Sequence, residues 1–459
     1  MFFWYSFCKF LNLYQAAQLP YFGVSASRCQ SQIKHLENRL QGRRNYMKFK
    51  HLLIIISLLT ASLTYAQTSS IVTIKKVASV TAISAVCVGN SECSTNIQEQ
   101  GVCWSTSSNP TINDNRTSNG TTAGKFIARI YGLEENTTYY IKGYMKTNSK
   151  TIYSDEMTFT TPAFPEGAVK GVFSIGETKQ VLFSQGNLQY QASTGTWRFA
   201  ENQYDFVGDD IRGNVMENGV KCDNSLIAPN YDGWIDLFGW GTSGWDNGNV
   251  FYHPYDNDCK SIDADHGFGY GPAHNNSYFY NLTGENSKAD WGIFNAISNG
   301  GNQPNQWKTL SNDEFYYLMK GRDNAKNKCG PATVCGVYGF VILPDNWETP
   351  DELDFEGYDV FDYTTNVYET NQWAEMENKG AVFLPLTGYR QGVKITNLIG
   401  QNKYGEYWTS TYDALRNASD AYYICFYASY GNSSFSMQSK GSGAKRYFGF
   451  AVRLVTNNN

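Results

Sequence analysis

Short runs of strand length, separated by turn residues, recur through residues 70–161. In chain order they are SVTAISAVCVG, NIQEQGVCWST, GKFIARIYGL, TTYYIKGYMKT and SDEMTFTTP. Gly, Asn, Ser and Glu fill the connections between them, and strands at this spacing are typical of a β-sandwich. The sequence therefore predicts that this part of the chain folds through sheets.

The composition points the same way for the whole chain. It contains 33 Tyr, 27 Phe, 11 Trp and 42 Gly among 459 residues. Aromatic residues favour strands and glycines serve turns, so a mostly β, loop-rich fold is expected. Only 17% of the residues are charged and the net charge is −5. Nucleic acid is bound largely through Lys and Arg, and a nucleic-acid partner is therefore not expected.

An export signal lies inside the chain, at Met47–Gln67, and reads MKFKHLLIIISLLTASLTYAQ. Lys48 and Lys50 supply the basic region, and Leu52 to Leu59 form an apolar run shorter than the roughly 20 residues that span a bilayer. Thr64-Tyr65-Ala66 is a suitable cleavage site. These features predict a signal peptide at residues 47–66.

Met47 is then the expected initiator, with residues 1–46 as a spurious N-terminal extension. A cytoplasmic extension with an uncleaved anchor is the alternative. We expect a mature chain that begins at Gln67, contains no transmembrane segment, and is exported to the periplasm, the cell surface or the extracellular space.

Export to an oxidising compartment allows disulfides. The sequence leaves two pairings open, Cys329 with Cys335 across a hairpin turn in GPATV, and Cys222 with Cys259 across a long loop. Cys87 and Cys103 lie within strand-like runs, where buried thiols are expected. The cysteine spacings match no zinc-binding pattern, and neither a metal nor another cofactor is predicted.

Residues 70–161 resemble a fibronectin type III domain. The stretch GLEENTTYYIKGY places Tyr139 six residues after Leu133, as in a tyrosine corner, and GVCWSTSSNPTI and the closing FTTP fit the same family. The resemblance implies that Tyr139 and Trp104 are core and corner residues. It implies a spacing or presenting role for this domain.

A Pro- and Gly-containing linker at residues 162–171 precedes a second domain at residues 172–459. Short strand-like runs recur in this domain. In WKTLSNDEFYYLMKGR, Ser311 is a fitting N-cap with Glu314 as its capping-box partner. Phe315, Leu318 and Met319 would then share one face of the helix.

This helix, with GEYWTSTY and the terminal FGFAVRL, resembles formylglycine-generating-enzyme-like domains, and the order of the runs resembles the Fibrobacter major paralogous domain. The resemblance implies a loop-rich α+β domain with a C-type-lectin-like fold. Formylglycine generation needs a late pair of copper-binding cysteines, and only Cys425 follows the corresponding strand. The chain is therefore not expected to be an enzyme of that kind.

The sequence offers little support for a hydrolase, a glycosidase or a metal site. His253, His266 and His274 have no metal-binding helical spacing, no G-x-S-x-G elbow is present, and no carboxylate pair stands out for glycoside hydrolysis. Asp256, Asp258, Asp263 and Asp265 lie close together and would suit calcium, but the stretch lacks the EF-hand pattern, and a solvated acidic loop is the favoured interpretation. The QPN tripeptide at Gln303–Asn305 resembles a lectin motif but precedes the helix instead of lying in a late loop.

Tryptophans alternate with glycines in YDGWIDLFGWGTSGWDNG. Ligands stack on exposed rings beside polar groups, whereas the favoured interpretation of Trp234 and Trp240 is that they pin the loop to the sheet. Trp245 and Asp246 are the candidate ligand-binding residues. The expected function is a non-catalytic exported binding or surface-interaction protein for an extracellular glycan or protein. The alternative is an exported enzyme acting on glycans or proteins.

Overall fold

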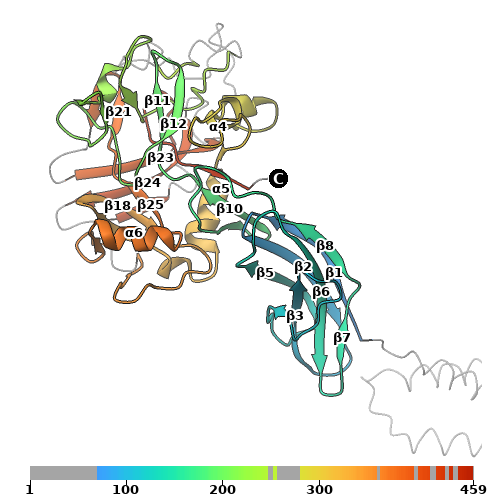
Figure 1. Cartoon of the computed structure of the whole chain (residues 1–459). Helices are drawn as coiled ribbons and strands as arrows, with labels where there is room; N and C mark the ends of the chain where they lie inside the picture. Colours follow the sequence, from blue (N-terminus) through green and yellow to red (C-terminus); the bar gives the residue numbers. More distant parts are fainter. Residues whose placement is uncertain are drawn as a thin grey trace, which may run out of the picture. The chain divides into compact units, whose positions relative to one another are not determined.

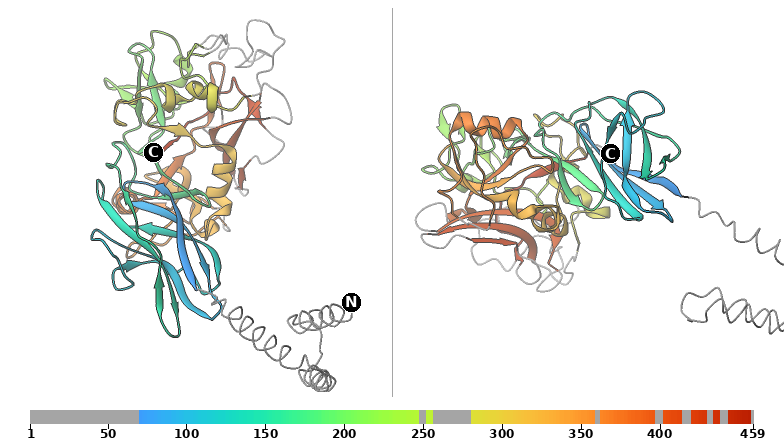
Figure 2. Two further views of the ribbon diagram at one scale, coloured as in Figure 1. Left: turned by 90° about the vertical axis from the view of Figure 1, so that its right-hand side faces the viewer. Right: turned by 90° about the horizontal axis from the view of Figure 1, so that it is seen from below.

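The computed structural model describes residues 70–246, 252–255, 280–358, 362–396, 402–413, 420–429, 434–437 and 443–457. The chain divides into two compact units, Met1–Ser69 and Ser70–Asn459, and every described residue belongs to the second. Figures 1 and 2 show its helices and strands from three sides. Among these residues, no helix is both long and apolar enough to cross a bilayer.

Strands β1 to β8 form two antiparallel sheets around a common core. The first sheet contains β1 (Ile71–Val80), β2 (Ser84–Glu92) and β5 (Gly124–Tyr131). The second contains β3 (Ile97–Ser105), β4 (Asn115–Arg116), β6 (Thr138–Thr147), β7 (Thr151–Tyr153) and β8 (Met157–Thr160). Burial alternates along β5, so Phe126, Ala128 and Ile130 face the core. We call residues 70–161 the β-sandwich.

The core of the β-sandwich contains both corner residues that the sequence singles out. Leu133 and Tyr139 are buried, and the Tyr139 hydroxyl accepts a hydrogen bond of 2.9 Å from the backbone N–H of Glu134. Trp104 packs against the same core from a half-buried position. Cys87 and Cys103 are buried free thiols, as predicted, and burial raises their pKa to about 12 and about 11.

Residues 162–171 join the β-sandwich to the first sheet of residues 172–459, the part of the chain that we call the C-terminal domain. This segment has no regular strand, but Ala168 forms a β-bridge with Ser184 and the N–H of Val169 donates to the carbonyl of Phe183 over 2.8 Å. The sheet contains β16 (Lys308–Thr309), β27 (Leu454–Thr456), β10 (Lys179–Phe183) and β9 (Phe173–Gly176). The end of the chain therefore pairs with the beginning of the domain.

The other strands form small sheets, antiparallel except for the parallel pair β17–β19. One half of the domain contains β11 (Leu188–Gln191), β12 (Thr196–Phe199), β13 (Met216–Glu217), β14 (Val220–Lys221) and β15 (Trp234–Ile235). A four-stranded sheet contains β17 (Cys329–Val334), β18 (Val337–Ile342), β19 (Val367–Tyr368) and β20 (Val382–Pro385). The late strands are β21 (Tyr389–Gln391), β22 (Lys394–Thr396), β23 (Asn402–Tyr412), β24 (Asp420–Ser429), β25 (Ser434–Met437) and β26 (Ala444–Lys445).

The helices of the C-terminal domain are short. They are η1 (Asn224–Leu226), η3 (Gly284–Ala289), α4 (Trp291–Phe294), α5 (Asn312–Tyr316), the π-helical turn η4 (Tyr317–Gly321), η5 (Ala325–Asn327) and α6 (Thr370–Asn378). α6 packs on the four-stranded sheet (Figure 1). Trp373 on α6 contacts Phe383 on β20 with ring centroids 5.7 Å apart. With the β-sandwich, these elements confirm the prediction of a mostly β fold.

α5 begins at the predicted capping box. The Ser311 hydroxyl accepts from the N–H of Glu314, and the Glu314 carboxylate accepts from the N–H of Ser311. The helix passes into η4, and Phe315, Leu318 and Met319 are all buried in one core cluster. The predicted helical face is therefore confirmed, although its second half is π-helical.

The proposed Cys329–Cys335 pairing is wrong. GPATV does not form the turn between the two cysteines but belongs to β17, which pairs with β18. Cys329 stands at the beginning of that strand and Cys335 just beyond its end, and both are free. Strand residues advance about 3.3 Å each, so the two thiols are much too far apart for a bond.

Candidate functional site

Trp245 lies just after a loop held by buried polar groups. The Ser243 hydroxyl donates to the carbonyl of Lys288 over 2.6 Å, and the Asn295 side chain donates to the carbonyl of Ser243 over 2.9 Å. Trp245 is half-buried against the aromatic core cluster of the domain, and its neighbour Asp246 is exposed. The predicted pair thus follows a hydrogen-bonded turn, with a half-buried ring beside an exposed carboxylate.

Trp234 and Trp240 lie inside the domain, with exposed fractions of 6% and 2%. The Trp234 indole donates to Glu217 over 2.6 Å, and the Trp240 indole donates to the carbonyl of Thr409 over 2.7 Å. Both rings therefore pin the loop to the domain and are unavailable for stacking on a ligand.

Further half-buried rings accompany Trp245. His253 stacks on Tyr255 with centroids 4.7 Å apart and contacts Tyr252 at 4.4 Å. Gly244 has φ +93°, and its position lies close to the His253 ring. Tyr280 contacts buried Trp240 at 5.9 Å. We call the half-buried residues Trp245, Tyr252, His253, Tyr255 and Tyr280 the aromatic loop surface.

Several sequence candidates lie outside the described residues. These are His266, His274, Cys259 and the aspartates Asp256, Asp258, Asp263 and Asp265. Gln303–Asn305 is an exposed turn before α5. Within the described ranges, no group of three or more His, Cys, Asp or Glu side chains is arranged to hold a metal ion.

A second group of titratable side chains lies on the β23–β24 hairpin. Glu406 is paired in register with Cys425, and both are buried. Burial raises the pKa of Glu406 to about 8, and burial followed by the Glu406 charge raises that of Cys425 well above its usual value. At neutral pH Glu406 is therefore a carboxylic acid and Cys425 a thiol, not a nucleophilic thiolate.

Half-buried tyrosines surround these two groups. The rings of Tyr404 and Tyr427 contact each other in a tilted arrangement with centroids 4.6 Å apart. Burial is the main cause of the raised pKa of Tyr389 and of Tyr404, and the Glu406 charge adds to both shifts. Among the described residues, Glu406 Oε2 is buried without a hydrogen-bond partner. The sequence offered one signal for this acid. In KYGEYW, alternation places Glu406 on the same strand face as Tyr404 and Trp408.

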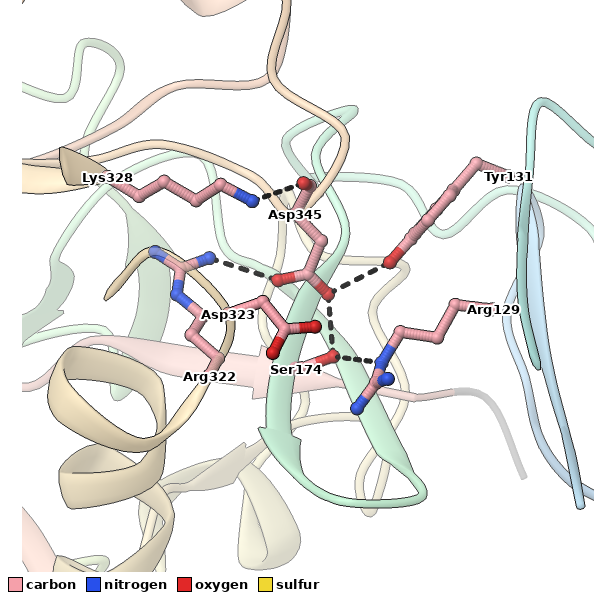
Figure 3. Close-up of a pocket in the computed structure, with 7 residues that line it drawn as sticks. All are labelled: Arg129, Tyr131, Ser174, Arg322, Asp323, Lys328 and Asp345. Carbon is pink, nitrogen blue, oxygen red and sulfur yellow. Dashed lines mark hydrogen bonds and ion pairs between the residues drawn. The ribbon is translucent and has the colours of Figure 1, made fainter. Parts of the chain in front are cut away.

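The β-sandwich and the C-terminal domain meet at a polar cavity (Figure 3). Asp345 is its hub. The Asp345 carboxylate accepts from Arg322 Nη1 at 3.1 Å, from Ser174 Oγ at 2.6 Å, and from the side chains of Gln180 and Tyr131 at 3.1 and 3.4 Å. The Arg322–Asp345 ion pair is almost fully buried. Such a pair fixes geometry because losing either partner leaves a buried charge.

More hydrogen bonds extend this junction. The Ser84 hydroxyl donates to Gln180 over 3.0 Å, and the N–H of Gln180 donates to Ser79 over 3.3 Å. Arg129 donates from Nε to Ser174 and from Nη2 to the carbonyl of Glu177. Sequence reasoning missed this site because its residues are distant along the chain and carry no shared motif.

No protein-family model and no curated protein matches the chain. Among solved structures, it is similar to the sensor domain of the anti-sigma factor RsgI4 of Pseudobacteroides cellulosolvens. A short version of that domain shows 21% identity and a TM-score of 0.17, with 21% of this chain and 96% of that chain covered. A longer version shows 23% identity at the same TM-score and coverage of 21% and 92%. A likeness at this TM-score does not define the fold or the function of the chain.

Proposed function

We propose that this protein is an exported, non-catalytic binding or surface-interaction protein that recognises an extracellular glycan or protein. The aromatic loop surface is the contact region, and Trp245 and Asp246 are its leading residues. The signal at residues 47–66 supports export. The β-sandwich, as a fibronectin type III-like module, presents a C-type-lectin-like domain formed by residues 172–459.

The observation that carries this proposal is the way Trp245 is held. Its ring is half-buried, while Ser243 and Asn295 anchor the loop before it through partly buried hydrogen bonds. A ring fixed before the ligand arrives loses little entropy on binding. Asp246 beside it supplies an exposed acceptor for hydroxyl or amide groups. Apolar rings with a few polar neighbours are typical of such sites.

A glycan array probed with the exported chain tests the proposal. For any glycan that binds, Trp245→Ala should weaken affinity by about 1–3 kcal/mol, the worth of stacking on one ring in nucleic-acid platforms. The melting temperature should stay unchanged. Tyr316→Ala is the matched control because Tyr316 is an exposed aromatic on α5. A lowered melting temperature with unchanged affinity would make Trp245 a structural residue.

The alternative, an exported enzyme acting on glycans or proteins, has one specific observation in its favour. Glu406 has a pKa of about 8, as a general acid at neutral pH requires. Glycoside hydrolysis needs a second carboxylate roughly 5–10 Å away. Release of product from an array glycan, abolished by Glu406→Gln in a chain that still folds, would favour the enzyme over the binding protein.

A further inference from the structure

We propose that the junction cavity between the β-sandwich and the C-terminal domain binds a small inorganic oxyanion of the phosphate or sulfate class. The cavity has a volume of about 40 Å³. Its lining side chains are labelled in Figure 3 and are Arg129, Tyr131, Ser174, Arg322, Asp323, Lys328 and Asp345. This site is independent of the aromatic loop surface.

The charges around the cavity do not balance. Three cationic side chains line it, Arg129, Arg322 and Lys328, against two carboxylates. The Asp345 carboxylate already accepts four hydrogen bonds and pairs with Arg322. Exposed Asp323 is the carboxylate left to face the other two cations. An anion in the cavity would compensate the remaining positive charge.

Both the β-sandwich and the C-terminal domain present hydrogen-bond donors at the cavity. Within the described part of the chain, Arg129 uses Nε and Nη2 in hydrogen bonds, so Nη1 keeps its two N–H groups. Lys328 donates one of its three N–H groups, to the carbonyl of Asp345. The cavity is therefore positive and rich in donors, which is the character of an oxyanion site.

The size of the cavity limits the ligand. A buried water needs at least 10–15 Å³, so 40 Å³ holds about three water oxygens. A free oxyanion with three or four oxygens is on this scale, and a nucleotide or an oligosaccharide is too large. Arg129 comes from β5 of the β-sandwich and Lys328 directly precedes β17 of the C-terminal domain. A bound oxyanion would therefore connect the two.

Titration of the full chain with sodium phosphate and with sodium sulfate, against sodium chloride at equal ionic strength, tests the site. We expect saturable binding of phosphate or sulfate by calorimetry, together with a rise in melting temperature that chloride does not produce. Arg129→Gln and Lys328→Gln should each weaken the anion at least tenfold. Lys125→Gln is the control because Lys125 is also on β5 but pairs with exposed Glu177.

Each result of the titration either supports or contradicts the anion site. Binding that is weakened by both cavity variants and kept by Lys125→Gln supports the proposal. Since a cavity variant could itself be less stable, its melting temperature without anion is measured first and binding is compared well below it. Equal binding by parent and both variants would place the anion elsewhere. Absence of saturable binding by the parent chain would also overturn the proposal.

Discussion

The β-sandwich and the C-terminal domain differ in the hydrogen-bond partners that they provide for buried backbone N–H and carbonyl groups. In the β-sandwich, long ladders such as β2–β5 and β3–β6 pair the N–H and carbonyl groups with one another. The C-terminal domain also has ladders, such as β17–β18 and β23–β24, and adds buried side chains that bond to backbone groups outside them. The Asn224 amide oxygen accepts from the N–H groups of Asp236 and Leu237, and the Trp408 indole donates to the carbonyl of Phe238. A loop-rich chain can bury its backbone only with such partners.

This difference has an electrostatic consequence. The C-terminal domain buries the carboxyl groups of Asp236, Asp290 and Glu406, and burial is the main reason that the pKa of each is raised, to about 6, about 6 and about 8. The clearest buried thiols of the β-sandwich, Cys87 and Cys103, keep their protons up to alkaline pH. The C-terminal domain should therefore be the pH-sensitive part of the molecule.

The largest expected effect is the pH dependence that Glu406 confers. Its pKa is about 8 in the folded chain against an ordinary 4.5, so the folded state holds the proton more tightly. This stabilisation is complete below about pH 4.5 and is lost as pH rises through about 8, a change on the order of 5 kcal/mol. Urea unfolding of Glu406→Gln should show a flatter profile and higher stability than the parent at pH 9.

An unchanged slope between pH 5 and pH 9 in Glu406→Gln would contradict the buried-acid interpretation. Asp236 and Asp290 contribute with the same sign between about pH 4 and pH 6. The change in unfolding free energy between about pH 4 and pH 6 should therefore persist in Glu406→Gln, and it provides an internal control for the measurement.

Removing the hub of the junction should have the next largest effect. Asp345→Ala leaves the Arg322 charge buried and three other donors without their acceptor, and should cost about 3–5 kcal/mol of unfolding free energy. The double variant Arg322→Met/Asp345→Leu should recover part of the loss. Lys125→Gln, which breaks an exposed pair, is the control. Chemical denaturation measures all three, and a loss in Asp345→Ala no greater than in Lys125→Gln would refute a structural hub.

Because Asn224 hydrogen-bonds buried backbone groups of the C-terminal domain, its removal should lower the free energy of unfolding, though by less than the loss of Asp345. Asn224→Ala removes the acceptor for two buried N–H groups and the donor to Gly208, at about 1–3 kcal/mol for the groups left unsatisfied. Gln98→Ala in the β-sandwich, which loses an exposed bond to Asn148, should be nearly neutral. Similar losses in the two variants, measured by urea unfolding, would mean that the buried Asn224 bonds contribute no more than an exposed side-chain bond.

The smallest effect is expected at the corner of the β-sandwich. Tyr139→Phe keeps the buried ring but removes the hydroxyl that accepts from the N–H of Glu134. The expected loss is about 1 kcal/mol. A thermal melt should show a lower transition temperature, with no change in the pH profile that Glu406 controls. A neutral substitution would show that water replaces the hydroxyl at this corner.

The sequence by itself determined the elements whose causes are local. Alternating apolar residues and turn residues specify the strands of the β-sandwich, and Ser311 with Glu314 specifies the start of α5, because period and capping depend only on near neighbours. The sequence also favoured burial of Trp234 and Trp240 over stacking on a ligand, and both side chains are buried. GPATV was mistaken for a turn, because its Gly and Pro are turn formers, whereas pairing with β18 and β19 holds it as a strand. The helix α6, Thr370–Asn378, was not predicted from the sequence.

Only the tertiary structure decided which polar groups meet. Asp345 lies 214 residues from Tyr131 and 171 from Ser174 along the chain, and no local pattern connects them. The pKa of Glu406 is raised because folding buries its carboxyl group, and not because of its neighbours in sequence. Local sequence sets periodicity, caps and turns, whereas desolvation and charge pairing depend on groups brought together from distant segments by folding.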